Sequence, residues 1–300
     1  MLRVLVTGGS GFIGSHVVDK LVADGYSVRV FDKVKPLRDD VEWFKGDLLN
    51  ENEVLEACKD IEAIYHLAAI ADVNVALSSF DLCLMINEMG TMNFLKAAQA
   101  EEVERFILAS TTWVYGNLYD KADETTPIPL PDHIYTKTKI GQEQLVYAWH
   151  KHYGLPYTVL RFDIPYGPRM RGNMAISIFA RRALRKEPIT IFGDGEQGRC
   201  FIYVEDLAEG NVAAIQESGK NEIFNLAGSR FVTMNQIIAG LEKIFGNLQV
   251  RYELARPHDF KGVVVSAKKA KERLNWEAKT PFQEGLQKYV EFLKADARPE

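Results

Sequence analysis

The sequence predicts an α/β fold in which helices cover both faces of a doubly wound parallel sheet. Three observations support this prediction. Short runs of β-branched and aromatic residues alternate with longer segments of helical periodicity, a glycine-rich turn joins the first such pair, and glycines stand where helices are expected to end. This alternation is typical of parallel strands joined by crossover helices.

The first half of the chain supplies five expected strands and four expected helices. The strands are RVLVTG, SVRVFD, EAIYHLAA, RFILAST and YTVLRF. The helices are FIGSHVVDKLVADG, NENEVLEACKD, FDLCLMINEMGTMNFLKAAQAEE and IYTKTKIGQEQLVYAWHKHYG. Gly25 and Gly154 occupy the C-cap positions of the first and last of these helices.

The glycine-rich turn TGGSGFIG, residues 7–14, follows the first expected strand and opens the first expected helix. Gly8 permits the tight turn, Gly11 lets the backbone approach a pyrophosphate, and Gly14 allows the helix to pack closely on the strand. Asp32 ends the second strand and could accept hydrogen bonds from both hydroxyls of an adenosine ribose, while repelling a 2'-phosphate. A Rossmann-type site that prefers NAD to NADP is therefore predicted.

The pattern changes after residue 164, where shorter strands and helices begin. Helices are expected around IFARRALRK, VEDLAEGNVAAIQ, MNQIIAGLEKIFG, AKKAKERL and FQEGLQKYVEFLKA. We predict two lobes: residues 1–164 form the dinucleotide-binding domain, to which part of 200–228 returns, and residues 165–300 form a smaller α/β lobe that binds the substrate.

Composition and charge restrict the partners. The chain has 300 residues, of which 47% are hydrophobic, and a formal net charge of -5, so neither nucleic acid nor an anionic membrane is expected. The short basic groups RMR at 169–171 and KKAKER at 268–273 are expected on solvated helix faces. No leader and no apolar run of about 20 residues is present, which favours a cytoplasmic protein.

Cysteines and histidines suggest no metal site. Cys58, Cys83 and Cys200 are isolated and odd in number, which argues against a disulfide framework or structural zinc and favours a reducing compartment. His150 and His152 lie among aromatic and basic residues and are expected on a helix surface. We assign no metal.

The segment HIYTKTKIG, residues 133–141, places Tyr135 and Lys139 four residues apart on one helix face. A neighbouring cation lowers the pKa of a phenol and would make Tyr135 a better base. Tyr147 and Lys151 repeat the spacing, so the spacing alone does not decide between a catalytic pair and an ordinary surface pair.

Taken together, the motifs resemble the extended short-chain dehydrogenase/reductase family, in its NAD-dependent nucleotide-sugar epimerase and dehydratase branch, which includes UDP-glucose 4-epimerases. The resemblance covers nearly the whole chain. Its motifs are TGGSGFIG, Asp32, GDL, HLAA at 66–69, STTWVYG at 110–116, YTKTK, LRFDIPYGPR, FGDGEQGRCFIYVEDLA and RPHD.

The resemblance implies roles for the catalytic residues. Tyr135 occupies the place of the family's active tyrosine, and Thr111 lies four residues before the tyrosine of the VYG element. Lys139 would assist Tyr135 and hold the nicotinamide ribose. Tyr147 lies about 1200° of helical rotation further on and so faces another direction.

The residues expected at the cofactor are Gly8, Gly11, Phe12, Ile13, Gly14, Asp32, Asp47, Leu48, Leu67, Ala68, Ala69, Tyr135 and Lys139.

Asp47 and several residues of the second lobe are expected to contact ligands. An ordinary structural role is the alternative for each of them. Asp47 could reach the adenine amino group or serve in a turn. Substrate contacts are expected from Thr111, Phe192, Arg199 and Arg256. The two arginines suit diphosphate oxygens, although either could form a structural ion pair, and Phe192 would lie near the nucleobase or in the core.

The expected reaction is C4 epimerisation of a UDP-hexose. Tyr135 takes a proton from a sugar hydroxyl as hydride leaves for NAD, and hydride returns to the other face of the keto sugar. Thr112 and Trp113 stand where dehydratases and decarboxylases of the branch carry an acid, which disfavours elimination. The alternatives are a nucleotide-sugar reductase, dehydrogenase or dehydratase, and a non-catalytic dinucleotide-sensing protein, which the presence of Thr111, Tyr135 and Lys139 disfavours.

Substrate identity and oligomeric state are left open. Ile164 replaces the family's substrate-contacting asparagine, and Asn74 and Ala76 replace a basic residue and a serine, which leaves no obvious recognition of an anionic uronic acid. The helices expected at 80–101 and 133–153 carry apolar residues on more than one face. A homodimer through these helices would explain them, and so would burial in the monomer. The residues concerned are Leu82, Met85, Leu145 and Trp149.

Overall fold

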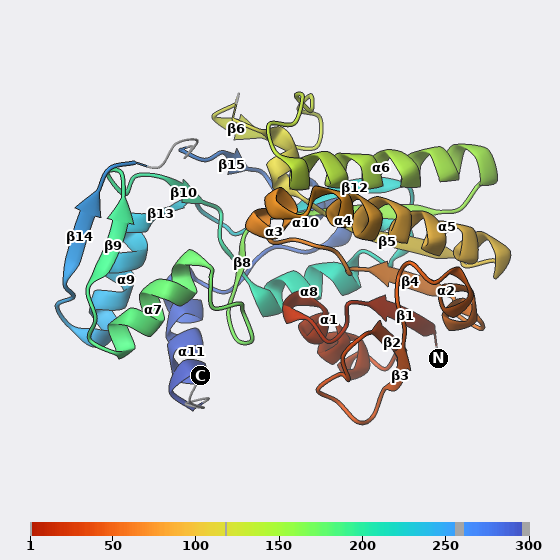
Figure 1. The fold of residues 1–300 in the computed structure, drawn as a ribbon, viewed down its shortest axis with the longest axis horizontal. Helices are drawn as coiled ribbons and strands as arrows, with labels where there is room; N and C mark the ends of the chain where they lie inside the picture. Colours follow the sequence, from red (N-terminus) through yellow and green to blue (C-terminus); the bar gives the residue numbers. More distant parts are fainter. Residues whose placement is uncertain (1, 118, 256–260, 296–300) are drawn as a thin grey trace.

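The computed structural model describes residues 2–117, 119–255 and 261–295, and it confirms the predicted fold class. Seven strands form one sheet in the order β12-β7-β5-β4-β1-β2-β3, and every neighbouring pair is parallel (Figure 1). The strands are β1 (Arg3–Thr7), β2 (Ser27–Asp32), β3 (Glu42–Lys45), β4 (Ala63–His66), β5 (Arg105–Thr111), β7 (Tyr157–Phe162) and β12 (Glu222–Leu226).

Helices cover both faces of this sheet, each over its own apolar core. Figure 1 shows α5 and α6 above the sheet and α1 and α8 below it. The core below the sheet includes Val17 of α1 and Leu207 of α8, and the core above it includes Phe94 of α5 and Val146 of α6. The helices are α1 (Phe12–Ala23), α2 (Glu51–Cys58), α5 (Gly90–Ala100), α6 (Ile134–Tyr153) and α8 (Val204–Ala213).

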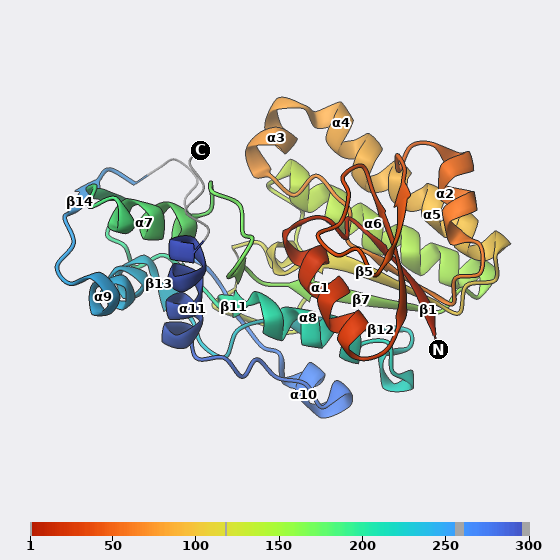
Figure 2. The same ribbon diagram turned by 90° about the horizontal axis from the view of Figure 1, so that it is seen from below.

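The second lobe is smaller and lies beside the sheet (Figure 2). It contains α7 (Ala175–Leu184), α9 (Met234–Phe245) and α11 (Phe282–Ala295), which share one apolar core. The lobe also contains short paired strands. β9 (Ile189–Phe192) pairs in parallel with β14 (Val250–Glu253), and β10 (Gly198–Arg199) pairs antiparallel with β13 (Val232–Thr233).

Two stretches of the second half of the chain lie with the first lobe. The first carries α8 and β12, the segment expected to return. The second stretch was not expected there, because the predicted boundary assigned all of 229–300 to the substrate lobe. There β15 (Val264–Val265) pairs with β6 (Lys121–Ala122), and α10 (Lys268–Leu274) places Ala270 and Leu274 in the core below the sheet. The apolar face of α10, not its position in the chain, decides which core it joins.

The long helix expected from residue 80 is interrupted, and a short helix not expected from the sequence precedes it. The segment runs as α3 (Val73–Ser78), α4 (Phe80–Leu84), a π-helical turn η1 (Met85–Met89), and then α5. Buried Asn87 explains the irregular turn. Its amide accepts from the Ile70 N–H at 2.8 Å, and donates to the Ile70 carbonyl at 3.1 Å and to the Thr138 hydroxyl at 2.9 Å.

The apolar residues of the two long helices divide into two groups. Leu82 and Met85 are 46% and 47% exposed, whereas Leu145 and Trp149 pack, partly buried, against the core above the sheet.

Cys58, Cys83 and Cys200 are buried free thiols. Within the described part of the chain, the helices are too short or too polar to cross a membrane.

Candidate active site

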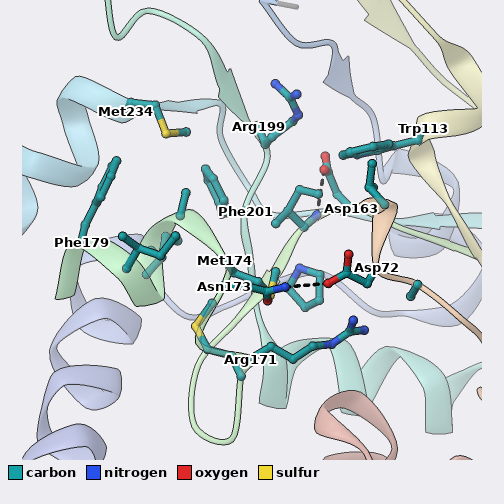
Figure 3. Close-up of a pocket in the computed structure, with 18 of the residues that line it drawn as sticks. Asp72, Trp113, Asp163, Arg171, Asn173, Met174, Phe179, Arg199, Phe201 and Met234 are labelled. Carbon is teal, nitrogen blue, oxygen red and sulfur yellow. Dashed lines mark hydrogen bonds between the residues drawn. The ribbon is translucent and has the colours of Figure 1, made fainter. Parts of the chain in front are cut away.

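A cavity of about 710 Å³ lies between the two lobes and gathers residues from distant parts of the chain (Figure 3). This volume falls within the usual range for small-molecule sites. Of the predicted site residues, Phe12, Ile13, Thr111, Tyr135, Phe192 and Arg199 line the cavity. The first four come from the lobe with the large sheet and the last two from the smaller lobe.

The turn between β1 and α1 has the shape needed for a dinucleotide. Gly8 adopts φ +70°, and a Cβ there would lie 2.9 Å from the Cα of Ala68. A Cβ on Gly14 would lie 2.1 Å from the Gly8 carbonyl oxygen, so no other residue fits this close approach of helix and turn. Gly11 is the N-cap of α1 and makes no side-chain cap. The amide groups at this helix end suit a pyrophosphate.

Asp32 and Asp47 both anchor backbone in the structure. The Asp32 carboxylate accepts from Ser10 N at 3.0 Å and from Val34 N at 3.1 Å, which fixes it at the end of β2 next to the glycine turn. Asp47 pairs with Lys33 at 2.8 Å and accepts from Leu49 N; the hydrogen bond from Lys33 lowers the pKa of Asp47. The turn role of Asp47 is thus present. The ribose and adenine contacts of these two residues stay predictions.

The segment HLAA is tied to the glycine turn through β1. Backbone N–H groups of Leu67 and Ala68 both donate to the hydroxyl of Thr7, at 3.1 Å each. That hydroxyl must then donate its own proton to Nδ1 of His66, 3.1 Å away. Burial lowers the pKa of His66 to about 3, so this ring is neutral and structural. Leu48 is buried, and Ala69 is partly buried next to Ala68.

Thr111 and Tyr135 meet at the cavity because a strand end and a helix start converge there. Thr111 is the last residue of β5, and Tyr135 lies in the first turn of α6, where the side chain of the N-cap His133 accepts from Tyr135 N. The side chains of Thr111 and Tyr135 are hydrogen-bonded. Trp113 packs edge-on against Tyr135, with ring centroids 6.4 Å apart.

The electrostatics of Tyr135 differ from the sequence expectation. Burial raises the pKa of Tyr135 to about 12, against the opposing charge of Arg171 and the hydrogen bond with Thr111. Lys139, expected to lower this pKa, donates instead to the carbonyl of Ala109 at 2.9 Å, and burial lowers its own pKa to about 8. A phenol with this pKa is protonated at neutral pH.

The start of α6 is held by Asn87, a positioning residue that the sequence analysis missed. Asn87 donates to the Thr138 hydroxyl, which in turn donates to the carbonyl of Tyr135 at 2.8 Å. The repeated pair on the same helix behaves as predicted from helix rotation. Tyr147 is 52% exposed, and the Lys151 ammonium lies 5.3 Å from the centroid of its ring.

The predicted substrate residues are only partly brought together. Phe192 and Arg199 line the cavity, as do Ile164 and Asn74, whereas Ala76 is fully buried. Arg256 lies outside the described residues.

The cavity contains a cation that the sequence analysis placed elsewhere. Arg171 belongs to the RMR group expected on a helix face, but this group lies in the loop before α7. Arg169 pairs there with Asp19 at 2.8 Å, and Arg171 lines the cavity (Figure 3). The cavity therefore contains a cation even though residue 74 is not basic. The KKAKER group lies on α10, as expected.

The cavity also contains a carboxyl group that the sequence analysis missed. Asp163 follows β7 directly, lines the cavity and is 3% exposed. Burial raises the pKa of Asp163 to about 7. The charge of Arg199 opposes this shift, and so do hydrogen bonds from the N–H groups of Ile164 and Cys200 and from the Thr112 hydroxyl. The sequence argument against elimination assumed that no titratable acid was available in the cavity. Asp163 is such an acid, so the assumption does not hold.

A profile of the NAD dependent epimerase/dehydratase family matches residues 4–227, well over half of the chain. The chain belongs to this family. The resemblance to extended short-chain dehydrogenases is thereby confirmed, and NAD is the cofactor, consistent with the glycine turn that a larger residue would fill.

Three members of this family indicate the range of chemistry among its relatives. A UDP-glucuronate 4-epimerase of Thermodesulfobacterium geofontis is 33% identical over 97% of this chain and 95% of its own. A UDP-glucuronic acid decarboxylase of Xenopus tropicalis is 32% identical over 98% of this chain and 72% of its own. The UDP-glucose 4-epimerase of Thermotoga maritima, solved with UDP-glucose, superposes with a TM-score of 0.92 at 34% identity, covering 99% and 100% of the two chains.

Proposed function

We propose that this enzyme epimerises a UDP-hexose at C4, with NAD as a bound cofactor that is regenerated in each cycle. The observation that carries this proposal is the hydrogen-bonded pair of Thr111 and Tyr135 in a cavity that begins at the cofactor turn. The similarity to 4-epimerases, one of them solved with UDP-glucose, supports the same reaction.

The residues of the chain supply the proton chemistry. NAD, when bound, accepts a hydride from the sugar carbon and returns it. Tyr135 would take the proton of the C4 hydroxyl, with Thr111 hydrogen-bonded to the same oxygen, and would give the proton back when the hydride returns. The positive charge of oxidised nicotinamide would lower the pKa of Tyr135, which burial raises to about 12. Trp113 and Ile164 line the cavity, and their apolar surface would help to exclude water.

The smaller lobe would hold the nucleotide. Arg199 lines the cavity on the side of β10, where its guanidinium can meet diphosphate oxygens. Phe192, partly buried at the end of β9, offers an apolar surface for the nucleobase.

Elimination or decarboxylation is the second candidate, and one specific observation favours it. Both reactions need a second group that moves a proton, and Asp163 is a carboxyl in the cavity with a pKa near neutrality. The similarity to UDP-glucuronic acid decarboxylases points the same way. We place epimerisation first because Asp163 does not occupy the position of the acid in the branch's elimination enzymes.

The product masses separate these reactions. We expect the purified protein, incubated with UDP-glucose, UDP-galactose, UDP-N-acetylglucosamine, UDP-glucuronate and UDP-xylose without added NAD, to interconvert one pair of equal-mass isomers. Chromatography with mass spectrometry measures this outcome. A product lighter by water or by carbon dioxide would contradict epimerisation, and consumption of added NAD in proportion to product would indicate a net dehydrogenase.

We further propose that the enzyme is a homodimer, built on the exposed apolar side chains before η1 and within it. Leu82, Met85 and Met89 are 46%, 47% and 48% exposed. Sedimentation equilibrium should give about twice the monomer mass of 33.9 kDa. Replacing Leu82 and Met85 together by aspartate should yield monomers, and an unchanged mass would show that the contact lies elsewhere.

A further inference from the structure

The buried face of α6 carries a carboxylate one helical turn beyond Lys139. Glu143 lies four residues after Lys139, as Lys139 lies four residues after Tyr135, so the three side chains project from one side of the helix. Lys139 and Glu143 are 4% and 8% exposed. Glu143 is therefore a buried charge on the helix that carries the proposed catalytic pair, and the proton transfer itself does not use it.

The same face of α6 contacts successive residues at the end of β5. The Lys139 ammonium donates to the carbonyl of Ala109 at 2.9 Å. The hydroxyl of the next residue, Ser110, donates to Glu143. Thr111 follows, and its side chain is hydrogen-bonded to the phenol at the start of the helix. Glu143 thus contacts the strand directly beside the residue that meets this phenol.

This one carboxylate faces two buried cations. Arg161 of β7 is the register partner of Ser110 in the sheet and donates to both oxygens of Glu143, at 3.0 and 2.7 Å. Arg161 thereby fixes the carboxylate on the side of α6 where Lys139 lies. Burial disfavours the charged form of Lys139, and the charge of Glu143 is the largest opposing influence.

We propose that Glu143 is a positioning residue that supplies the counter-charge of Lys139 and so keeps its ammonium charged. The inference rests on the proposed function, which gives Lys139 its task at the phenol and the nicotinamide ribose. A charged ammonium has three N–H groups, of which one is used by Ala109. A neutral amine would donate fewer hydrogen bonds and would no longer stabilise an anionic Tyr135.

The other ionisable side chains around Lys139 cannot replace Glu143 in this role. Cys83 of α4, His66 of β4 and Tyr135 of α6 face it. Burial raises the pKa of the Cys83 thiol, lowers that of His66 to about 3 and raises that of Tyr135 to about 12. All three are uncharged at neutral pH, so within the described part of the chain the negative charge that acts on Lys139 comes from Glu143.

NMR titration of the NAD-loaded protein, with lysine labelled with carbon-13 at Cε, measures the charge state of Lys139 without turnover. Lys139→Met identifies the signal. We expect Lys139 to titrate about one pH unit lower in Glu143→Gln than in the parent. The high-pH limb of the pH–rate profile, measured with the substrate pair found in the panel, should move down by the same amount, because Lys139 loses its proton there. Glu143→Asp keeps the charge and should stay close to the parent in both measurements.

Glu88→Gln is the matched control. Glu88 also pairs with a lysine of α6, Lys137, at 2.6 Å, but the Lys137 side chain is 48% exposed. Lys139 should therefore titrate as in the parent. If Glu143→Gln does not fold, replacing Glu143 and Arg161 together by methionine leaves no buried charge of this pair, and Lys139 should again titrate below the parent.

Two results would overturn the inference: equal titration of Lys139 in the parent and in the Glu143 variant that folds, or an equal shift in Glu88→Gln. Lack of turnover with every sugar of the panel would instead overturn the proposed function. The NMR titration would then still decide whether Glu143 sets the charge of Lys139.

Discussion

Tyr135→Phe is expected to reduce turnover by about 10³-fold or more while leaving NAD bound. The loss is large because the variant keeps the ring and its packing against Trp113 but removes the only atom that would carry the proton. Tyr147→Phe is the matched control, since Tyr147 lies on the same helix and is 52% exposed. Initial rates with the substrate pair found in the panel give the measurement. Near-normal rates in Tyr135→Phe would remove this residue from the mechanism.

Ultraviolet titration of tyrosinate gives a second readout for Tyr135 that does not depend on turnover. Burial raises the pKa of Tyr135 to about 12, so in a sample stripped of NAD its phenol should stay protonated through pH 10. Loading with oxidised NAD adds a positive charge and should produce one tyrosinate at lower pH that is missing in Tyr135→Phe. If both forms titrate alike with NAD bound, the cofactor does not activate this phenol.

Glu143→Gln is expected to lower the free energy of unfolding by about 3 kcal/mol, because it leaves a buried guanidinium without its counter-charge. Glu143 on α6 accepts two hydrogen bonds from Arg161 on β7, at 3.0 and 2.7 Å, and one from the hydroxyl of Ser110. Both charged side chains are under 9% exposed. Arg161 also donates to the phenol oxygen of Tyr115 at 3.0 Å, so the buried pair joins α6 to the sheet.

Urea denaturation of each variant measures this effect, and the same helix provides the control. Lys137 pairs with Glu88 at 2.6 Å, but its side chain is 48% exposed, so Lys137→Gln should cost less than about 1 kcal/mol. Replacing Glu143 and Arg161 together by methionine should recover part of the loss, because no buried charge then remains. A Glu143→Gln variant as stable as Lys137→Gln would show that the buried pair is energetically unimportant.

Some features of the site follow from short segments, and these were predicted correctly from the sequence. The glycine turn works through local backbone shape, since Gly8 needs a positive φ and Gly14 has no room for a Cβ. The separation of Tyr135 from Tyr147 follows from helix rotation alone. The alternation of apolar runs with helical segments likewise predicts the parallel sheet, because strands joined by crossover helices run in the same direction.

Other features depend on atoms far apart in the chain, and only the tertiary structure decided them. Lys139 faces the carbonyl of Ala109 and not the phenol one turn away, because the end of β5 lies under that side of α6. Asn87 sets a π-helical turn through contacts with Ile70 and Thr138. Neither partner can be inferred from spacing along the sequence.

The sequence by itself thus determined the sheet and the cofactor turn, which rest on local geometry, whereas the roles of Thr111 and Tyr135 were expected from the resemblance to the family. The tertiary structure alone decided the chemistry of Asp163. Its raised pKa results from burial, which outweighs the charge of Arg199 and the hydrogen bonds to the carboxyl group. Burial is a property of the assembled chain, since removing a carboxyl group from water requires every surface that surrounds it.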